Sequence, residues 1–136
     1  MTSSRVQTKT LAANNITNGR SEAEKIDSVV SFTGQAFKIP EAAEPLLVLN
    51  SNFISSMPDT AWAFRDHTPR IPVGGWFQGA FIKFGKGRLA VFGEAVMFTA
   101  QVSGKSKRKM GMNHPAAKQN AQFLLNVIHW LDGLIE

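Results

Sequence analysis

The chain contains no cysteine, which excludes disulfide bonds, thiolate nucleophiles and zinc sites built from cysteine. It also lacks any apolar run close to the ~20 residues that cross a bilayer. Its first fifteen residues, MTSSRVQTKTLAANN, contain no apolar segment of the kind that secretory signals carry. We therefore expect no membrane contact and take the cytoplasm as the compartment.

The composition is that of an ordinary globular protein, with 43% hydrophobic and 18% charged residues among 136. A chain of this length forms one domain that removes roughly two-thirds of its unfolded surface from water. Residues 1–15 are rich in Ser, Thr and Asn without periodicity, and predict an irregular or flexible lead-in. Residues 16–136 then form a single domain.

The net charge is +5, and four of the basic residues lie close together in residues 105–109. Elsewhere the basic residues are scattered among carboxylates, and the aromatic residues fall in predicted strands and helix faces. A nucleic-acid surface more often shows a basic stripe interleaved with exposed aromatics. The pattern favours a solvated loop and argues against a nucleic-acid partner, with an anion-binding or nucleic-acid-binding patch as the alternative. The residues of this basic cluster are Lys105, Lys107, Arg108 and Lys109.

Hydrophobic patterning predicts three main elements. Residues 78–84 and 88–92 form a hairpin around a Gly-Lys-Gly turn, and the LLVL run at 46–49 forms a short strand buried on both faces. Residues 117–135 repeat apolar positions at helical spacing around most of the circumference, so this long helix should be largely buried. Residues 51–75 contain three prolines and predict a long loop, anchored by packing of Phe53, Ile54, Trp62 and Phe64.

Four blocks of sequence carry a resemblance to a known family. They are ITNGRSEAEKIDSVVSFTGQAF, PRIPVGGWFQGA, GKGRLAVFGEAVMFTAQ and MGMNHPAAKQNAQFLLNVIHWLDGL. Together they resemble the C-terminal half of uncharacterised bacterial proteins that are similar to the class I glutamine amidotransferase-like superfamily, which has a flavodoxin-like fold. The resemblance covers residues 16–136.

This resemblance implies an α/β fold, equal to half of a doubly wound one. We expect a small mixed, mostly parallel sheet of about four to five strands, with the hairpin at residues 78–92 and the long C-terminal helix packed on one face. Half of such a fold leaves a sheet face and an edge uncovered. We therefore expect a homo-oligomer, most simply a dimer, in which a second copy covers them.

The resemblance does not extend to the amidotransferase reaction. In that superfamily a cysteine nucleophile is activated by a His-x-Glu pair that follows the last sheet strand. Here the matching strand leads into Glu94, but Phe92 stands where the histidine would be, and the chain has no cysteine. The missing nucleophile and the missing His-x-Glu pair argue against an enzyme.

Glu94 and His114 are the candidate reactive residues. A carboxylate directly after an apolar strand is partly buried and needs partners. Glu94 is therefore either a general base or ligand anchor, or an acceptor that ties the amides of the MGMN loop to the sheet. His114 precedes Pro115 at the expected start of the helix, where Asn113 is a plausible N-cap. It is either a ligand donor or an ordinary loop histidine.

The sequence thus predicts a small-molecule-binding or interaction module with no cofactor and no metal site. One alternative is a hydrolase-type enzyme in which Glu94 is the base and His114 assists; the other is an anion or nucleic-acid binder using residues 105–109. The ligand itself is not specified by the sequence. The candidate ligand-binding residues are Glu94, Phe98, Gln101, Met112, Asn113, His114, Trp76 and Gln78.

Overall fold

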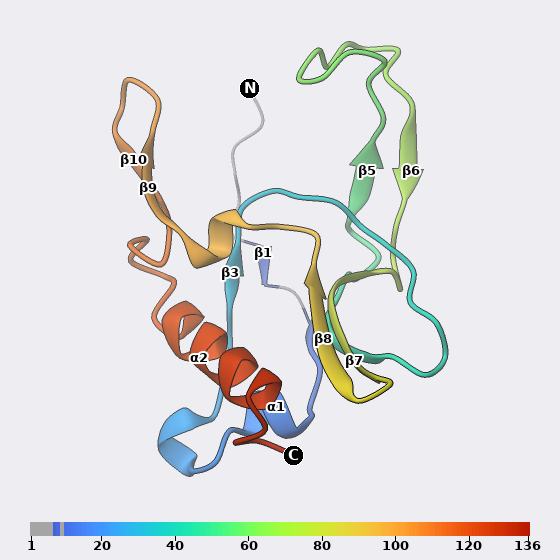
Figure 1. Cartoon of the computed structure of the whole chain (residues 1–136). Coiled ribbons are helices and arrows are strands. Elements are labelled where there is room, and N and C mark those ends of the chain that lie inside the picture. The colour runs from blue at the N-terminus through green and yellow to red at the C-terminus, as the bar shows by residue number, and fades with distance from the viewer. Residues whose placement is uncertain (1–6, 9) are drawn as a thin grey trace.

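The computed structural model, which describes residues 7–8 and 10–136, is built around a four-stranded antiparallel sheet (Figure 1). Its three pairings are all antiparallel, and its strand order is β2-β4-β7-β8. In the described part of the chain, β2 and β8 are the two edges of this sheet. The strands are β2 (Thr10–Leu11), β4 (Glu44–Val48), β7 (Phe77–Phe84) and β8 (Gly87–Phe92).

The remaining strands form three two-stranded antiparallel pairs. They are β1 (Gln7–Thr8) with β3 (Val30–Ser31), β5 (Ile54–Ser56) with β6 (Arg70–Pro72), and β9 (Ala100–Ser103) with β10 (Arg108–Gly111). The β5–β6 and β9–β10 pairs project from the body as separate arms (Figure 1). The helical elements are α1 (Asn15–Asn18), η1 (Glu22–Glu24), η2 (Val96–Phe98) and α2 (Asn120–Leu131).

The expected mostly parallel sheet of a half doubly wound α/β fold is wrong, and the flavodoxin-like fold is wrong with it. Parallel neighbours need a crossover of a dozen or more residues, usually a helix. Here β7 and β8 are joined by Gly85 and Lys86 alone. Residues 49–76, between β4 and β7, are long enough for a crossover but carry the β5–β6 arm instead, so the strands return antiparallel.

The β7–β8 hairpin lies where the glycine-flanked turn predicts it. Gly85 adopts a positive φ of 58°, and the register runs from Phe84 opposite Gly87 to Gly79 opposite Phe92. Because side chains alternate along each strand, the hairpin has two distinct faces. One face packs on α2, while the other carries Ala80, Ile82, Phe84, Leu89 and Val91.

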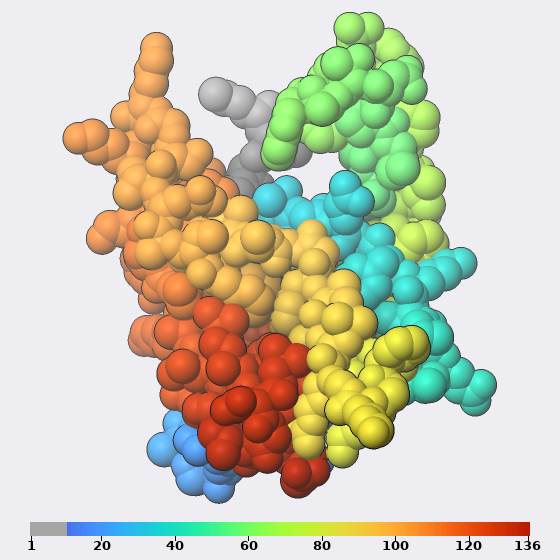
Figure 2. Space-filling view, viewed as in Figure 1, coloured from blue at the N-terminus to red at the C-terminus, as the bar shows by residue number. Residues whose placement is uncertain are grey.

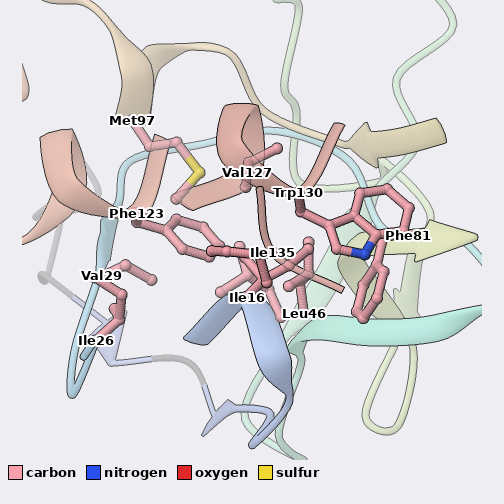
Figure 3. Close-up of a cluster of buried hydrophobic side chains, with 11 residues drawn as sticks. Ile16, Ile26, Val29, Leu46, Phe81, Met97, Phe123, Val127, Trp130 and Ile135 are labelled. Atoms are coloured by element: carbon pink, nitrogen blue, oxygen red, sulfur yellow. The ribbon is translucent and has the colours of Figure 1, made fainter. Parts of the chain in front are cut away.

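The core fills the space between α2 and the sheet (Figure 3). Trp130 meets Phe81 edge-on with ring centroids 4.9 Å apart, and Phe123 meets Phe92 in the same way at 5.9 Å. Each such buried side chain contributes about 1.5–3 kcal/mol. The other buried members include Ile16, Ile26, Val29, Leu46, Leu47, Met97, Val127 and Ile135.

Helix α2 differs from the prediction in length and in the face it buries. It begins at Asn120, so Asn113 is not its N-cap. Two polar side chains, Asn120 and Asn126, are completely buried, while Leu125 and Ile128 are each 47% exposed. The expectation of a helix buried around its circumference is therefore wrong. The buried asparagines form hydrogen bonds with backbone groups of distant segments, and these bonds satisfy their polar side chains in the core.

The β5–β6 arm replaces the long loop expected at residues 51–75. Trp62 is 81% exposed, and Phe64 and Ile54 are exposed as well, so their predicted role as packing anchors is wrong. Backbone pairing holds the arm instead, including the bonds from the Met57 amide to the Pro69 carbonyl and from the Val73 amide to the Phe53 carbonyl.

The predicted N-terminal lead-in is only partly within the described residues. Residues 1–6 and 9 lie outside them, while β1 and β2 pair with β3 and β4. Over the described chain, none of the helices has both the length and the apolar character needed to cross a bilayer.

Candidate functional site

Glu94 holds a turn at residues 32–33. The side chain lies directly after β8 and is 5% exposed. Its Oε1 atom accepts hydrogen bonds from the backbone amides of Phe32, at 2.6 Å, and Thr33, at 2.8 Å. Two amides that converge on one carboxylate oxygen form charge-assisted bonds, which are stronger than neutral ones. Glu94 therefore ties the chain after β3 to the end of β8.

Gln78 supports the same turn from β7. Its Nε2 group donates to the Thr33 carbonyl at 3.1 Å. The next residue, Gly34, has a φ of 119°, and a Cβ atom there would lie 2.8 Å from the Glu94 Cβ and 2.4 Å from the Gly93 carbonyl oxygen. The turn is packed so closely against Gly93 and the Glu94 Cβ that only glycine fits at this position.

His114, Asn113 and Gln101 lie together at the base of the β9–β10 arm. His114 accepts a hydrogen bond from the Ala116 amide through Nδ1, and its ring lies edge-on to Phe32, with centroids 5.5 Å apart. Asn113 donates to the Gln101 carbonyl at 3.1 Å. Phe32 thus brings His114 into the neighbourhood of Glu94, because its ring contacts the imidazole while its amide bonds to the carboxylate.

The other predicted ligand-binding residues, Phe98, Met112 and Trp76, lie in other parts of the fold. Phe98 lies in η2 and packs against Phe92 and Phe123, with ring centroids 5.0 and 5.9 Å away, as part of the core. The Met112 amide donates to the carbonyl of Thr99, at the base of the β9–β10 arm. Trp76 lies before β7, and its ring carries the Lys38 ammonium 4.9 Å above its centroid. The eight predicted ligand-binding residues are therefore spread over several elements of the fold.

An apolar groove lies elsewhere, on the face of the β7–β8 hairpin that α2 does not cover. It has a volume of about 350 Å³ and is closed on one side by the chain that leads from β3 to β4. In the space-filling view these two segments, yellow and cyan, lie side by side (Figure 2). Among residues 7–8 and 10–136, Lys38 is the only charged residue in its lining. The apolar lining is Phe37, Ile39, Pro40, Ala43, Ala80, Phe81, Ile82, Phe84, Leu89 and Val91.

One feature of the sequence indicates this groove, although the predicted site did not include it. Leu89 and Val91 alternate with Ala90 and Phe92, so β8 is apolar on both faces, although the chain offers a single long helix to cover them. The sequence does not indicate that Phe37 and Ile39 line the groove. Their place against β7 depends on the bridge between Phe37 and Phe77, which are 40 positions apart in sequence.

The basic cluster lies on the β9–β10 arm. Its predicted loop is the tip of a two-stranded antiparallel ribbon, in which Ser103 pairs with Arg108 and Val102 with Lys109. Residues 100–109 are all exposed. Within residues 7–8 and 10–136, no group of three or more His, Cys, Asp or Glu side chains is placed to hold a metal ion.

Comparison of the chain with protein-family models, with curated proteins and with solved structures finds no match.

Proposed function

We propose that the protein is a small-molecule-binding module whose groove over β7 and β8 binds an amphipathic anion, with an apolar body and a single negative head group. The observation that carries this proposal is the composition of the lining, in which Lys38 is the one charged residue that the described part of the chain contributes among otherwise apolar side chains. Its volume falls in the range of about 300–1,000 Å³ that is common for small-molecule sites.

The geometry of the groove supports an apolar ligand body. Phe84, Leu89 and Val91 stand on the free sheet face and are 76%, 49% and 44% exposed. Covering apolar surface of this kind stabilises a complex by about 25 cal/mol for each Å² removed from water. Strand pairing already fixes the backbone that carries these side chains, so a ligand has to order only their rotamers.

The position of Lys38 supports an anionic head group. Lys38 lines the groove, and its ammonium is held over the face of the neighbouring Trp76 ring, 4.9 Å from the ring centroid. A cation–π contact of this kind orients the ammonium without neutralising its charge. A carboxylate at the end of an apolar chain would then find a counter-charge beside an apolar wall.

Titration with dodecanoate, dodecanol and dodecylammonium tests both halves of this proposal. By isothermal titration calorimetry we expect dodecanoate to bind most tightly, with about tenfold weaker binding of dodecylammonium. Lys38→Met should weaken dodecanoate about fivefold to tenfold and leave dodecanol unchanged. Equal affinities for the three probes, or no binding by any of them, would contradict the proposal.

A matched pair of variants locates the binding. Val91→Asp places a carboxylate on the groove face and should weaken dodecanoate more than tenfold. Ile54→Asp makes a similar change at an exposed aliphatic residue on the β5–β6 arm, outside the groove, and should leave affinity unchanged. Equal losses in the two variants would place the binding outside the groove.

We also propose a homodimer, built on the exposed stripe of α2. Leu125 and Ile128 are exposed on α2, Lys118 lies two residues before the helix begins, and Asp132 is its C-cap, so opposite charges flank the two apolar side chains. In an antiparallel pairing of two copies centred on Leu125, Lys118 of one copy lies opposite Asp132 of the other. The charges at the two ends of this surface are therefore complementary when two copies pair in this way.

Light scattering on a size-exclusion column measures this association. We expect a mass of two chains at high concentration, and a shift to a single chain when Leu125→Asp and Ile128→Asp are combined, since two copies would then face each other with buried carboxylates. The control is Leu89→Asp, an equally exposed leucine on the sheet, which should leave the mass unchanged. A single-chain mass for the unaltered protein over a hundredfold concentration range would refute the dimer.

A further inference from the structure

The net positive charge of the protein comes from one segment. The chain has 15 basic and 10 acidic residues, and residues 95–131 contain five of the basic ones and none of the acidic ones. The ten basic residues elsewhere are matched by ten acidic residues, so this segment accounts for the whole net charge of +5. Four of its five charges lie on the β9–β10 ribbon.

The ribbon presents these charges in several directions. Lys105 and Lys107 lie in the turn, and Arg108 and Lys109 begin β10. Neighbouring side chains on a strand point to opposite faces, so Arg108 and Lys109 leave the ribbon on opposite sides. Figure 2 shows the ribbon, in orange, standing clear of the body. A polyanion that surrounds the tip can therefore contact every one of the four cations.

The base of the ribbon is fixed to the body. Gly111 is buried with a φ of 101°, and a Cβ atom there would lie 2.0 Å from the Thr99 carbonyl oxygen. That same carbonyl accepts the Met112 amide at 2.6 Å, and Asn113 bonds to the Gln101 carbonyl. Because the base is rigid, the ribbon is already oriented before it meets a partner, which reduces the entropy lost on binding.

We propose that the β9–β10 ribbon binds the phosphate backbone of double-stranded nucleic acid without sequence preference. This proposal goes beyond the groove, which lies on another part of the molecule. A two-stranded ribbon fits the major groove of a duplex, which is about 12 Å wide. Its cations would reach the phosphates on both sides of that groove.

The composition of the ribbon favours a duplex over other polyanions. Residues 100–111 contain no aromatic side chain, so the ribbon has no surface on which the bases of a single strand would stack. The tip, Gly104 to Lys107, carries no apolar side chain that would insert into a lipid surface. These features revise the expectation of a purely solvated loop.

Fluorescence anisotropy with a labelled 20-base-pair DNA duplex tests the proposal across 25–200 mM salt. If all four cations contact phosphates, the logarithm of the binding constant should fall with the logarithm of salt concentration with a slope of about −3.6. Combining Lys105→Ala, Lys107→Asn, Arg108→Ala and Lys109→Ala should abolish binding. Asparagine is chosen at 107 because Lys107 has a positive φ of 49°, which Asn tolerates well.

A control of equal charge separates the ribbon from general attraction. Replacing Lys25, Arg65, Arg70 and Lys86 by alanine lowers the net charge by the same four units but leaves the ribbon intact. This variant should keep both the affinity and the salt slope. An equal loss in the two variants, tighter binding of the matching single strand or of phosphatidylserine vesicles, or no binding at 25 mM salt would each overturn the proposal. If the fourfold variant fails to fold, the pair Lys105→Ala and Lys109→Ala should reduce the slope to about half.

Discussion

Replacing Asn120 by alanine should lower the free energy of unfolding by about 4 kcal/mol. The side chain is fully buried, and its Oδ1 accepts the Val30 amide at 2.9 Å. Its Nδ2 donates to the carbonyls of Val30 and Met97, at 2.8 and 2.9 Å. Alanine leaves all three backbone groups without that partner, and each such group costs about 1–3 kcal/mol when it stays buried. Urea unfolding followed by circular dichroism measures the loss.

Asn120→Asp separates hydrogen bonding from packing, because aspartate has nearly the same shape as asparagine. It keeps an acceptor for the Val30 amide but removes both donors and brings a negative charge against two carbonyls. We expect at least as large a loss as for alanine. Asn52→Ala, at an exposed position, should change stability by less than about 0.5 kcal/mol. A stable Asp variant would show that the side chain only fills space.

Replacing Glu94 by alanine should lower the free energy of unfolding by about 3 kcal/mol, since two amides lose their charged acceptor. Glu94→Gln keeps a carbonyl oxygen at the same place and should lose about 1 kcal/mol. Denaturant unfolding gives both values, and hydrogen exchange at the amides of Phe32 and Thr33 locates the effect.

The exposed Glu41 is the matched control for that series, and Glu41→Ala should leave both stability and exchange unaltered. Unchanged exchange at Phe32 and Thr33 in Glu94→Ala would show that the carboxylate does not order the turn. The same variant should still bind dodecanoate, because Glu94 does not line the groove over β7 and β8.

Local patterns in the sequence identified the elements whose signals are local. The Gly-Lys-Gly turn predicted the hairpin of β7 and β8, and the LLVL run predicted the strand that the structure has at β4, with Leu46 and Leu47 buried. The direction of strand pairing has no such signal. It depends on whether residues 49–76 return the chain through a crossover helix or as an arm, and composition alone did not distinguish the two.

Prediction of the candidate site from the sequence was limited by the same lack of non-local information. The position of Glu94 after an apolar strand indicated a carboxylate that needs partners, and it is indeed buried. The predicted partners were the amides of the MGMN loop, whereas the observed ones, Phe32 and Thr33, lie 62 and 61 residues earlier in the chain. No pattern within one segment identifies such a pair.

The two buried asparagines of α2 also determine the order in which the protein can fold. Asn120 and Asn126 bond to backbone groups of Val30, Ile16 and Glu24, which lie 90, 110 and 102 residues earlier in the chain. Closing loops of this size costs more entropy than closing a hairpin, so these contacts form more slowly. While the chain is being synthesised, the segment from α1 to β3 cannot complete these hydrogen bonds until α2 has left the ribosome. The β7–β8 hairpin, whose partners are adjacent, can form well before then.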